Sequence, residues 1–90
     1  MYYTEILARI HQVLRPRTYV EIGVYKGKAM ALAGPQTDAI GIDPEPQPGI
    51  VEGPRRRVFA LTSDAYFAAH DLRAQLGGLP LDLALIDGMH

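Results

Sequence analysis

The fold is decided by a short stretch near the N-terminus, TYVEIGV at residues 18–24. It is rich in β-branched and aromatic residues, which is typical of a buried strand. Before it, apolar residues recur at helical spacing over residues 6–14 and form one stripe. We expect an amphipathic helix there, with Thr4 as its N-cap and Pro16 as its stop, leading directly into the strand.

The alternation of helix and strand continues along the chain. Further strands are expected at residues 39–43, 58–62 and 81–86. Helices are expected at residues 27–33 and from Ser63, as N-cap, to Leu76, whereas residues 45–54 are rich in proline and glycine and are expected to form a loop. Buried strands that alternate with helices predict an α/β fold with a parallel sheet and helices on both faces.

Composition narrows the classes of partner. The chain has 90 residues, enough for one domain, and a formal net charge of −1, which gives no long-range attraction to nucleic acid or to an anionic membrane. Cysteine is absent, so disulfides and thiolate metal sites are excluded, and the cytoplasm is the default location. No apolar run approaches the roughly 18 residues that span a bilayer. The basic run at residues 55–57 is expected to be a solvated turn, with a phosphate or partner contact as the alternative.

Candidate site residues follow from the strand ends. Ligands of open parallel sheets bind beyond the carboxyl ends of the strands. A carboxylate lies at or beside each expected strand end, and these residues are Glu21, Asp43, Asp64 and Asp87.

The segment after the first strand favours a particular ligand class. Gly23 allows a tight turn close to a ligand, and Gly27 is expected to open a helix whose N–H groups favour a polar or negative group. Asp43, at the next strand end, is where a carboxylate would accept hydrogen bonds from ribose hydroxyls. Tyr25 and Lys28 stand where a dinucleotide fingerprint needs glycine. A nucleoside-bearing ligand without a pyrophosphate therefore fits best.

Four motifs together carry a family resemblance. The pattern Glu-x-Gly-x-x-x-Gly at residues 21–27 resembles the first motif of class I S-adenosylmethionine-dependent methyltransferases, and GIDP at residues 41–44 is similar to their acidic second motif. LTSD at residues 61–64 resembles the segment that borders the adenine. LIDGMH at residues 85–90 is similar to the motif after the fourth strand, in a form closest to a small-molecule O-methyltransferase branch that includes catechol O-methyltransferase-like enzymes.

The resemblance implies a Rossmann-like fold and a role for each candidate residue. Glu21 and the loop from Gly23 to Gly27 would hold the methionine moiety, and Asp43 would bind the ribose. The implied adenine contacts are Ser63 and Asp64, and the implied catalytic residues are Asp87, as a Mg²⁺ ligand, and His90, as a general base where catechol-type enzymes have lysine. A hydroxyl of a small-molecule methyl acceptor would attack the methyl group of S-adenosylmethionine in line.

Plainer interpretations stay open at this point. The two glycines could serve ordinary turns, Asp43 could be a capping acid and Asp87 could belong to a simple turn. His11 and His70 are expected at the surface. The alternative functions are a non-catalytic nucleoside-binding or assembly module and, less well matched, a reductase on a related sheet.

The resemblance also implies a sheet cut short. The family's sheet has seven strands, and this chain supplies four of them, in the implied spatial order third-second-first-fourth. We expect a single incomplete domain over residues 1–90, either a fragment of a longer enzyme or a homo-oligomer that pairs through the open edge of the fourth strand. The isolated chain should then be marginally stable or self-associating.

Overall fold

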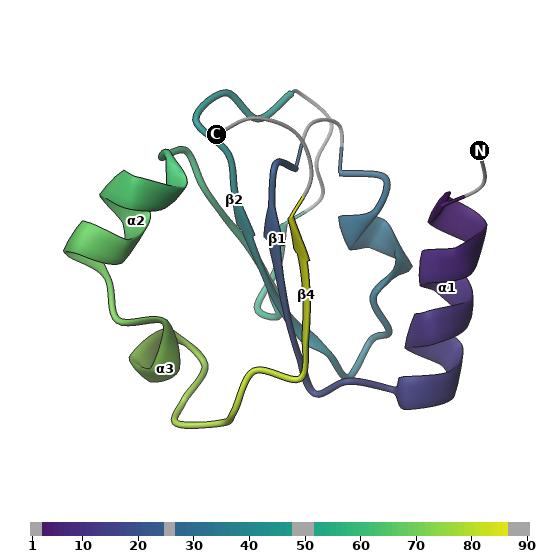
Figure 1. Ribbon diagram of the computed structural model, residues 1–90. Helices are drawn as coiled ribbons and strands as arrows, with labels where there is room; N and C mark the ends of the chain where they lie inside the picture. The colour runs from purple at the N-terminus through teal and green to yellow at the C-terminus, as the bar shows by residue number, and fades with distance from the viewer. Residues whose placement is uncertain (1–2, 25–26, 48–51, 87–90) are drawn as a thin grey trace.

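The computed structural model describes residues 3–24, 27–47 and 52–86 and contains one parallel sheet (Figure 1). Its four strands lie in the order β3-β2-β1-β4, and every neighbouring pair is parallel. The elements, in chain order, are α1 (Tyr3–Leu14), β1 (Thr18–Ile22), the 3-10 helix η1 (Met30–Leu32), β2 (Asp38–Ile42), β3 (Arg56–Phe59), α2 (Ser63–Ala69), α3 (Leu72–Gln75) and β4 (Leu83–Ile86). The α/β fold and the strand order expected from the sequence are confirmed.

Helices cover both faces of this sheet. In Figure 1, α1 and η1 lie on one side of the strands, and α2 and α3 lie on the other. Successive residues of a strand point to opposite faces, so each strand contributes to two cores. We call the face toward α1 and η1 the Tyr19 face, and the face toward α2 and α3 the Tyr66 face, after the buried tyrosine of each core.

The Tyr19 face is closed by a shorter helix than the sequence predicts. Its core consists of Tyr19, Val24, Met30, Ala33 and Ala39. The helix expected over residues 27–33 is only η1, because Gly27 adopts a left-handed φ of 81° and closes a turn on the carbonyl of Val24, and because Ala33 is extended. The expected opening of a helix at Gly27 is therefore wrong.

Helix α1 packs on this face through a different stripe from the one expected. Leu7 and His11, one turn apart, are buried, whereas Ile6, Val13 and Leu14 are more than half exposed. His11 is only 5% exposed and meets Tyr19 edge-on, with 4.9 Å between ring centroids, so the prediction of a surface histidine is wrong. The helix already begins at Tyr3, which places Thr4 inside the first turn rather than at the N-cap.

On the Tyr66 face, the single helix expected from residue 63 is two helices. Helix α2 ends at Ala69, and His70 is extended, with φ −130° and ψ 148°. The side chain of Asp71 then accepts the N–H of Arg73 and caps α3 as a new helix. His70 is half-buried and stacks on Tyr66, so its expected surface position is also wrong.

The arginines at residues 55–57 do not form a solvated turn, because β3 begins at Arg56. Arg56 points to the Tyr19 face and donates to the carbonyls of Ala33, Gly34 and Thr37 at 2.8, 2.6 and 2.5 Å. Arg57 points to the Tyr66 face and donates to the side chain and carbonyl of Gln75. Only Arg55 fits the expectation: it is exposed and pairs with Asp38 at 3.4 Å.

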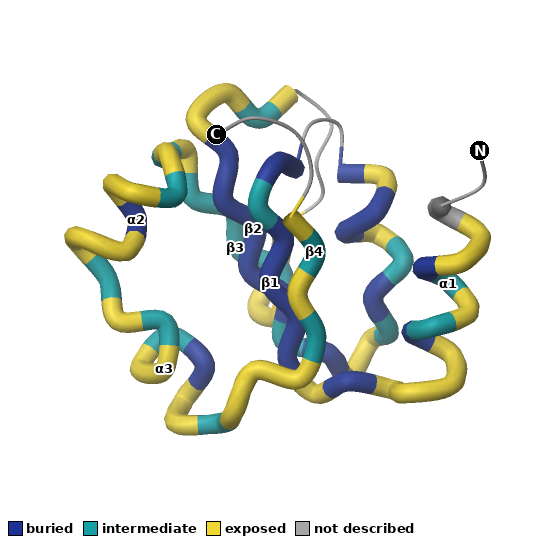
Figure 2. The backbone as a smooth tube through the Cα atoms, viewed as in Figure 1, coloured by how far each residue is buried: buried dark blue, intermediate teal, exposed yellow. Residues whose placement is uncertain are grey.

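Strand β4 is an edge of the sheet, and its burial alternates along the strand (Figure 2). Leu83 and Leu85 pack on the Tyr19 core, whereas Ala84 and Ile86 face the other way and are exposed, Ile86 by 72%. The open edge expected from the sequence is therefore present within the described part of the chain. No helix in the same part is both long and apolar enough to cross a membrane.

Candidate functional site at the carboxyl end of the sheet

The turn after β1 requires glycine at both predicted positions. Gly23 has a φ of 93° and Gly27 a φ of 81°, a region that residues with a side chain rarely adopt. The N–H of Gly23 donates to the carbonyl of Ile42 at 2.8 Å, so the turn starts directly against the end of β2. Two of the predicted residues are therefore shown to be conformationally constrained, which agrees with the plain turn interpretation as well as with a ligand loop.

Asp43 joins the ends of three strands. Its Oδ2 accepts the N–H of Val24 at 2.8 Å, and its Oδ1 accepts the N–H of Glu45 at 2.8 Å. Its own N–H donates to the carbonyl of Phe59, the last residue of β3, at 3.1 Å. The capping role that the sequence left open is therefore present.

Glu21 is a buried carboxylate on the Tyr19 face, 1% exposed. The hydroxyl of Tyr19 donates to its Oε1 at 2.5 Å. In the sheet register, Glu21 lies between Gly41 on β2 and Leu85 on β4, neither of which carries a polar side chain. A charge in such surroundings needs hydrogen-bond donors to be tolerated, and Tyr19 provides one.

Ser63 and Asp64 begin α2, which starts at the same end of the sheet as the ends of the strands (Figure 1). The predicted cap is wrong by one residue: Thr62 caps α2, because its hydroxyl accepts the N–H of Ala65 at 3.1 Å. Ser63 is the first helical residue and half-buried, and Asp64 is exposed. Both therefore lie near the strand ends, and neither of them is the residue that caps the helix.

The remaining predicted residues, Asp87 and His90, lie outside the described residues. So do Tyr25 and Lys26 of the glycine turn. Within residues 3–24, 27–47 and 52–86, no three His, Asp or Glu side chains gather closely enough to hold a metal ion. The Mg²⁺ site expected around Asp87 therefore stays a prediction.

Sequence reasoning missed Tyr19 and the backbone of Val24. The signal for Tyr19 was present, because residues two apart on a strand share a face, and Tyr19 precedes Glu21 by two. The bond from Val24 to Asp43 had no such signal, since it joins a backbone group of one loop to a side chain of another.

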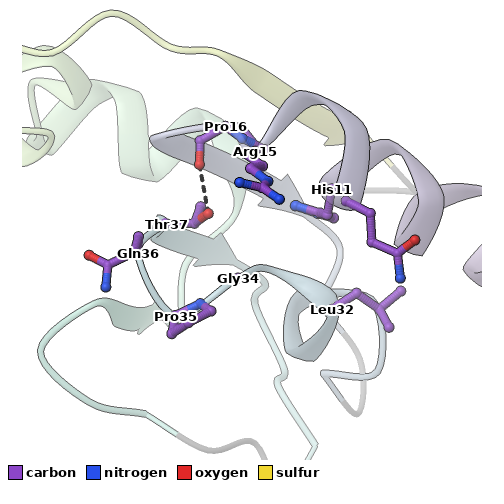
Figure 3. A pocket seen from close by; sticks show the side chains of 9 residues that line it. His11, Arg15, Pro16, Leu32, Gly34, Pro35, Gln36 and Thr37 are labelled. Carbon is purple, nitrogen blue, oxygen red and sulfur yellow. Dashed lines mark hydrogen bonds between the residues drawn. The ribbon is translucent and has the colours of Figure 1, made fainter.

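A cavity of about 450 Å³ lies at the opposite end of the sheet (Figure 3). It is lined by the last turn of α1 and by the loop before β2, and the hydroxyl of Thr37 donates to the carbonyl of Pro16 beside it at 2.6 Å. None of the predicted site residues lines this cavity. His11 borders it, and burial first, then the charge of Arg56, lowers the pKa of its imidazole below the usual 6.5.

Comparison with known proteins gives no family: no protein-family model matches the sequence, and no curated protein matches it. The functional argument therefore rests on the geometry at the carboxyl end of the sheet. That geometry consists of a glycine turn, a carboxylate bonded to the turn and a second, buried carboxylate on the strand that leads into it.

Proposed function

We propose that this chain is the cofactor-binding part of an S-adenosylmethionine-dependent methyltransferase that acts on oxygen of a small molecule. The observation that carries the proposal is the bond between Asp43 and the N–H of Val24, which fixes the glycine turn of β1 against the end of β2. A preformed turn with an adjacent carboxylate, at the carboxyl edge of a parallel sheet, is where such folds bind nucleosides.

Different residues at the sheet edge would contact different parts of the cofactor. Glu21 and the turn from Gly23 to Gly27 would receive the methionine moiety, whose amino group is positive. Asp43 would accept the ribose hydroxyls, and Ser63 and Asp64 would lie beside the adenine. These groups hold the cofactor at the sheet edge, so that the methyl group faces an incoming hydroxyl in line with the sulfur.

The chemistry itself would be simple. The bound cofactor supplies an electrophilic methyl group, and the acceptor oxygen takes it as the carbon–sulfur bond breaks. His90 would take the proton of the hydroxyl, and Asp87 would hold a Mg²⁺ ion that orients it. This proposal includes the cytoplasm as the default location.

Isothermal titration of the chain with S-adenosylhomocysteine tests the proposal. Asp43→Ala should abolish binding. Because Asp43 also caps a turn, the matched control is Asp71→Ala, which removes another carboxylate that accepts a backbone N–H, from Arg73 at 3.0 Å, far along the chain. Loss of binding in Asp43→Ala but not in Asp71→Ala supports the proposal. A folded wild-type chain that does not bind contradicts it.

A second candidate is a non-catalytic nucleoside-binding or assembly module. The observation that favours it is the exposed edge of β4, where Ile86 is 72% exposed and a second copy could pair. In this case adenosine should bind with the same affinity as S-adenosylhomocysteine. The chain should also form a homo-oligomer in sedimentation experiments. Discrimination between the two ligands would favour the methyltransferase.

A further inference from the structure

Tyr19 spans the core and the candidate site. Its side chain is fully buried, packed among Val24, Met30 and the alanines of the Tyr19 core and met edge-on by His11. Its hydroxyl donates to Glu21 Oε1 at 2.5 Å within this buried layer. The ring therefore holds a hydrogen-bond donor against a carboxylate of the strand that leads into the glycine turn.

The orientation of Glu21 depends on the donors that reach it. A glutamate side chain has three rotatable bonds and, when unconstrained, many rotamers. Glu21 is buried, so water has little access to its carboxylate, and the hydroxyl of Tyr19 is one of the groups that hold it. The bond from Tyr19 links the carboxylate to a rigid aromatic ring, and a charge-assisted bond of this kind is stronger than a neutral one.

We propose that Tyr19 is a positioning residue that orients Glu21 toward the amino group of the methionine moiety, so that the site selects the complete cofactor over a bare nucleoside. This inference rests on the proposed function, because it takes Glu21 as the residue that meets the amino group. It adds that the selectivity is set by a residue that does not touch the ligand.

The other buried tyrosine is a matched control. Tyr66 is also fully buried, but on the opposite face, and its hydroxyl has no hydrogen-bond partner among the residues that the structure describes. Tyr66→Phe removes the same atom from an equally buried ring without touching Glu21. Any effect of deleting a buried phenol hydroxyl as such should therefore appear in both variants.

The test compares two probes, S-adenosylhomocysteine and methylthioadenosine, which lacks the amino acid part. Tyr19→Phe should weaken S-adenosylhomocysteine binding about tenfold, as expected for loss of a bond to a charged group, and leave methylthioadenosine binding unchanged. Tyr66→Phe should change neither affinity. A double-mutant cycle with Glu21→Leu adds a second readout: in that background, Tyr19→Phe should no longer affect S-adenosylhomocysteine.

The outcomes separate the two proposals. An equal loss for both probes, or no loss for either, would overturn the positioning role while the proposed function stands. A full effect of Tyr19→Phe in the Glu21→Leu background would do the same. If the wild-type chain binds methylthioadenosine and S-adenosylhomocysteine equally, the selectivity itself is absent. If it binds neither, the proposed function fails, and this inference fails with it.

Discussion

The two faces of the sheet are built from alternate residues of the same strands, yet they treat polar groups differently. On the Tyr19 face, Tyr19 bonds Glu21 and Arg56 bonds three carbonyls, whereas neither ring nitrogen of the buried His11 has a partner within the described residues. On the Tyr66 face the hydroxyl of Tyr66 has no partner within the described residues, and Arg57 reaches only Gln75. The clearest difference lies in the two buried tyrosines: the hydroxyl of Tyr19 holds a carboxylate, and that of Tyr66 has no partner among the described residues.

The largest expected difference between the faces concerns the two arginines. Arg56→Ala should lower the free energy of unfolding by about 3 kcal/mol, because it removes the guanidinium bonds to the carbonyls of Ala33, Gly34 and Thr37, of which Gly34 keeps only the N–H of Thr37 within the described residues. Arg57→Ala should cost only about 1 kcal/mol, since Gln75 lies nearer to solvent. Urea denaturation of both variants measures the difference. An equal loss of free energy of unfolding in the two variants would contradict the difference between the two faces.

Gly41 tests how tightly the Tyr19 face is packed beside the site. A Cβ at this position would lie 2.6 Å from Cγ2 of Val24 and 2.9 Å from Sδ of Met30. We expect Gly41→Ala to destabilise the chain by about 2 kcal/mol through overpacking. Adding Val24→Ala should recover part of that loss by removing the closer atom. Thermal unfolding of the single and double variants checks this. If Gly41→Ala left the stability unchanged, Val24 and Met30 would have to move aside to make room for the added methyl group.

The smallest expected effect is a pH dependence from His11. Burial lowers the pKa of this imidazole in the folded chain below the 6.5 of the unfolded one, so the unfolded state binds more protons in acid. The contribution of the neutral His11 to the free energy of unfolding should therefore be fully present above pH 6.5. It should fall as the pH drops below 6.5, by at most about 1.4 kcal/mol per pH unit, until the pKa of the folded chain is reached.

The groups that bear on His11 are Arg56, whose charge lowers its pKa further, and Tyr19, the neutral ring that it meets. Denaturant unfolding between pH 5 and 8 should show a slope that disappears in His11→Leu and persists in His70→Asn. A slope unchanged by His11→Leu would mean that another group titrates there.

The sequence allowed the strands of the sheet to be predicted, but not the details of the helices that pack on it. Strands that are apolar on both faces are a local signal, and so is the tight turn expected at Gly23, and both led to correct predictions, whereas the helix start expected at Gly27 did not. Helix identity failed where tertiary contacts decide: His11 is buried because it follows Leu7 by one turn, and Asp71 splits a helix whose apolar pattern runs straight through it.

The candidate site was predicted in a similarly partial way. Glu21, Gly23 and Asp43 were proposed from their place at strand ends, and the parallel sheet does bring the loop after Gly23 to the carboxylate of Asp43. The contacts that organise them were not found, because the bond from Val24 to Asp43 joins two loops that are far apart in sequence. The roles of Asp87 and His90 remain predictions from the family resemblance.

We propose that a nucleoside-bearing ligand binds at the carboxyl end of the sheet, on the glycine turn that Asp43 fixes. The most direct measurement is the change in backbone amide NMR signals of the labelled chain on addition of S-adenosylhomocysteine. We predict shifts at Gly23, Val24 and Asp43, with Gly34 and Thr37 at the opposite cavity unmoved. Shifts confined to Gly34 and Thr37, or none at all, would contradict the account.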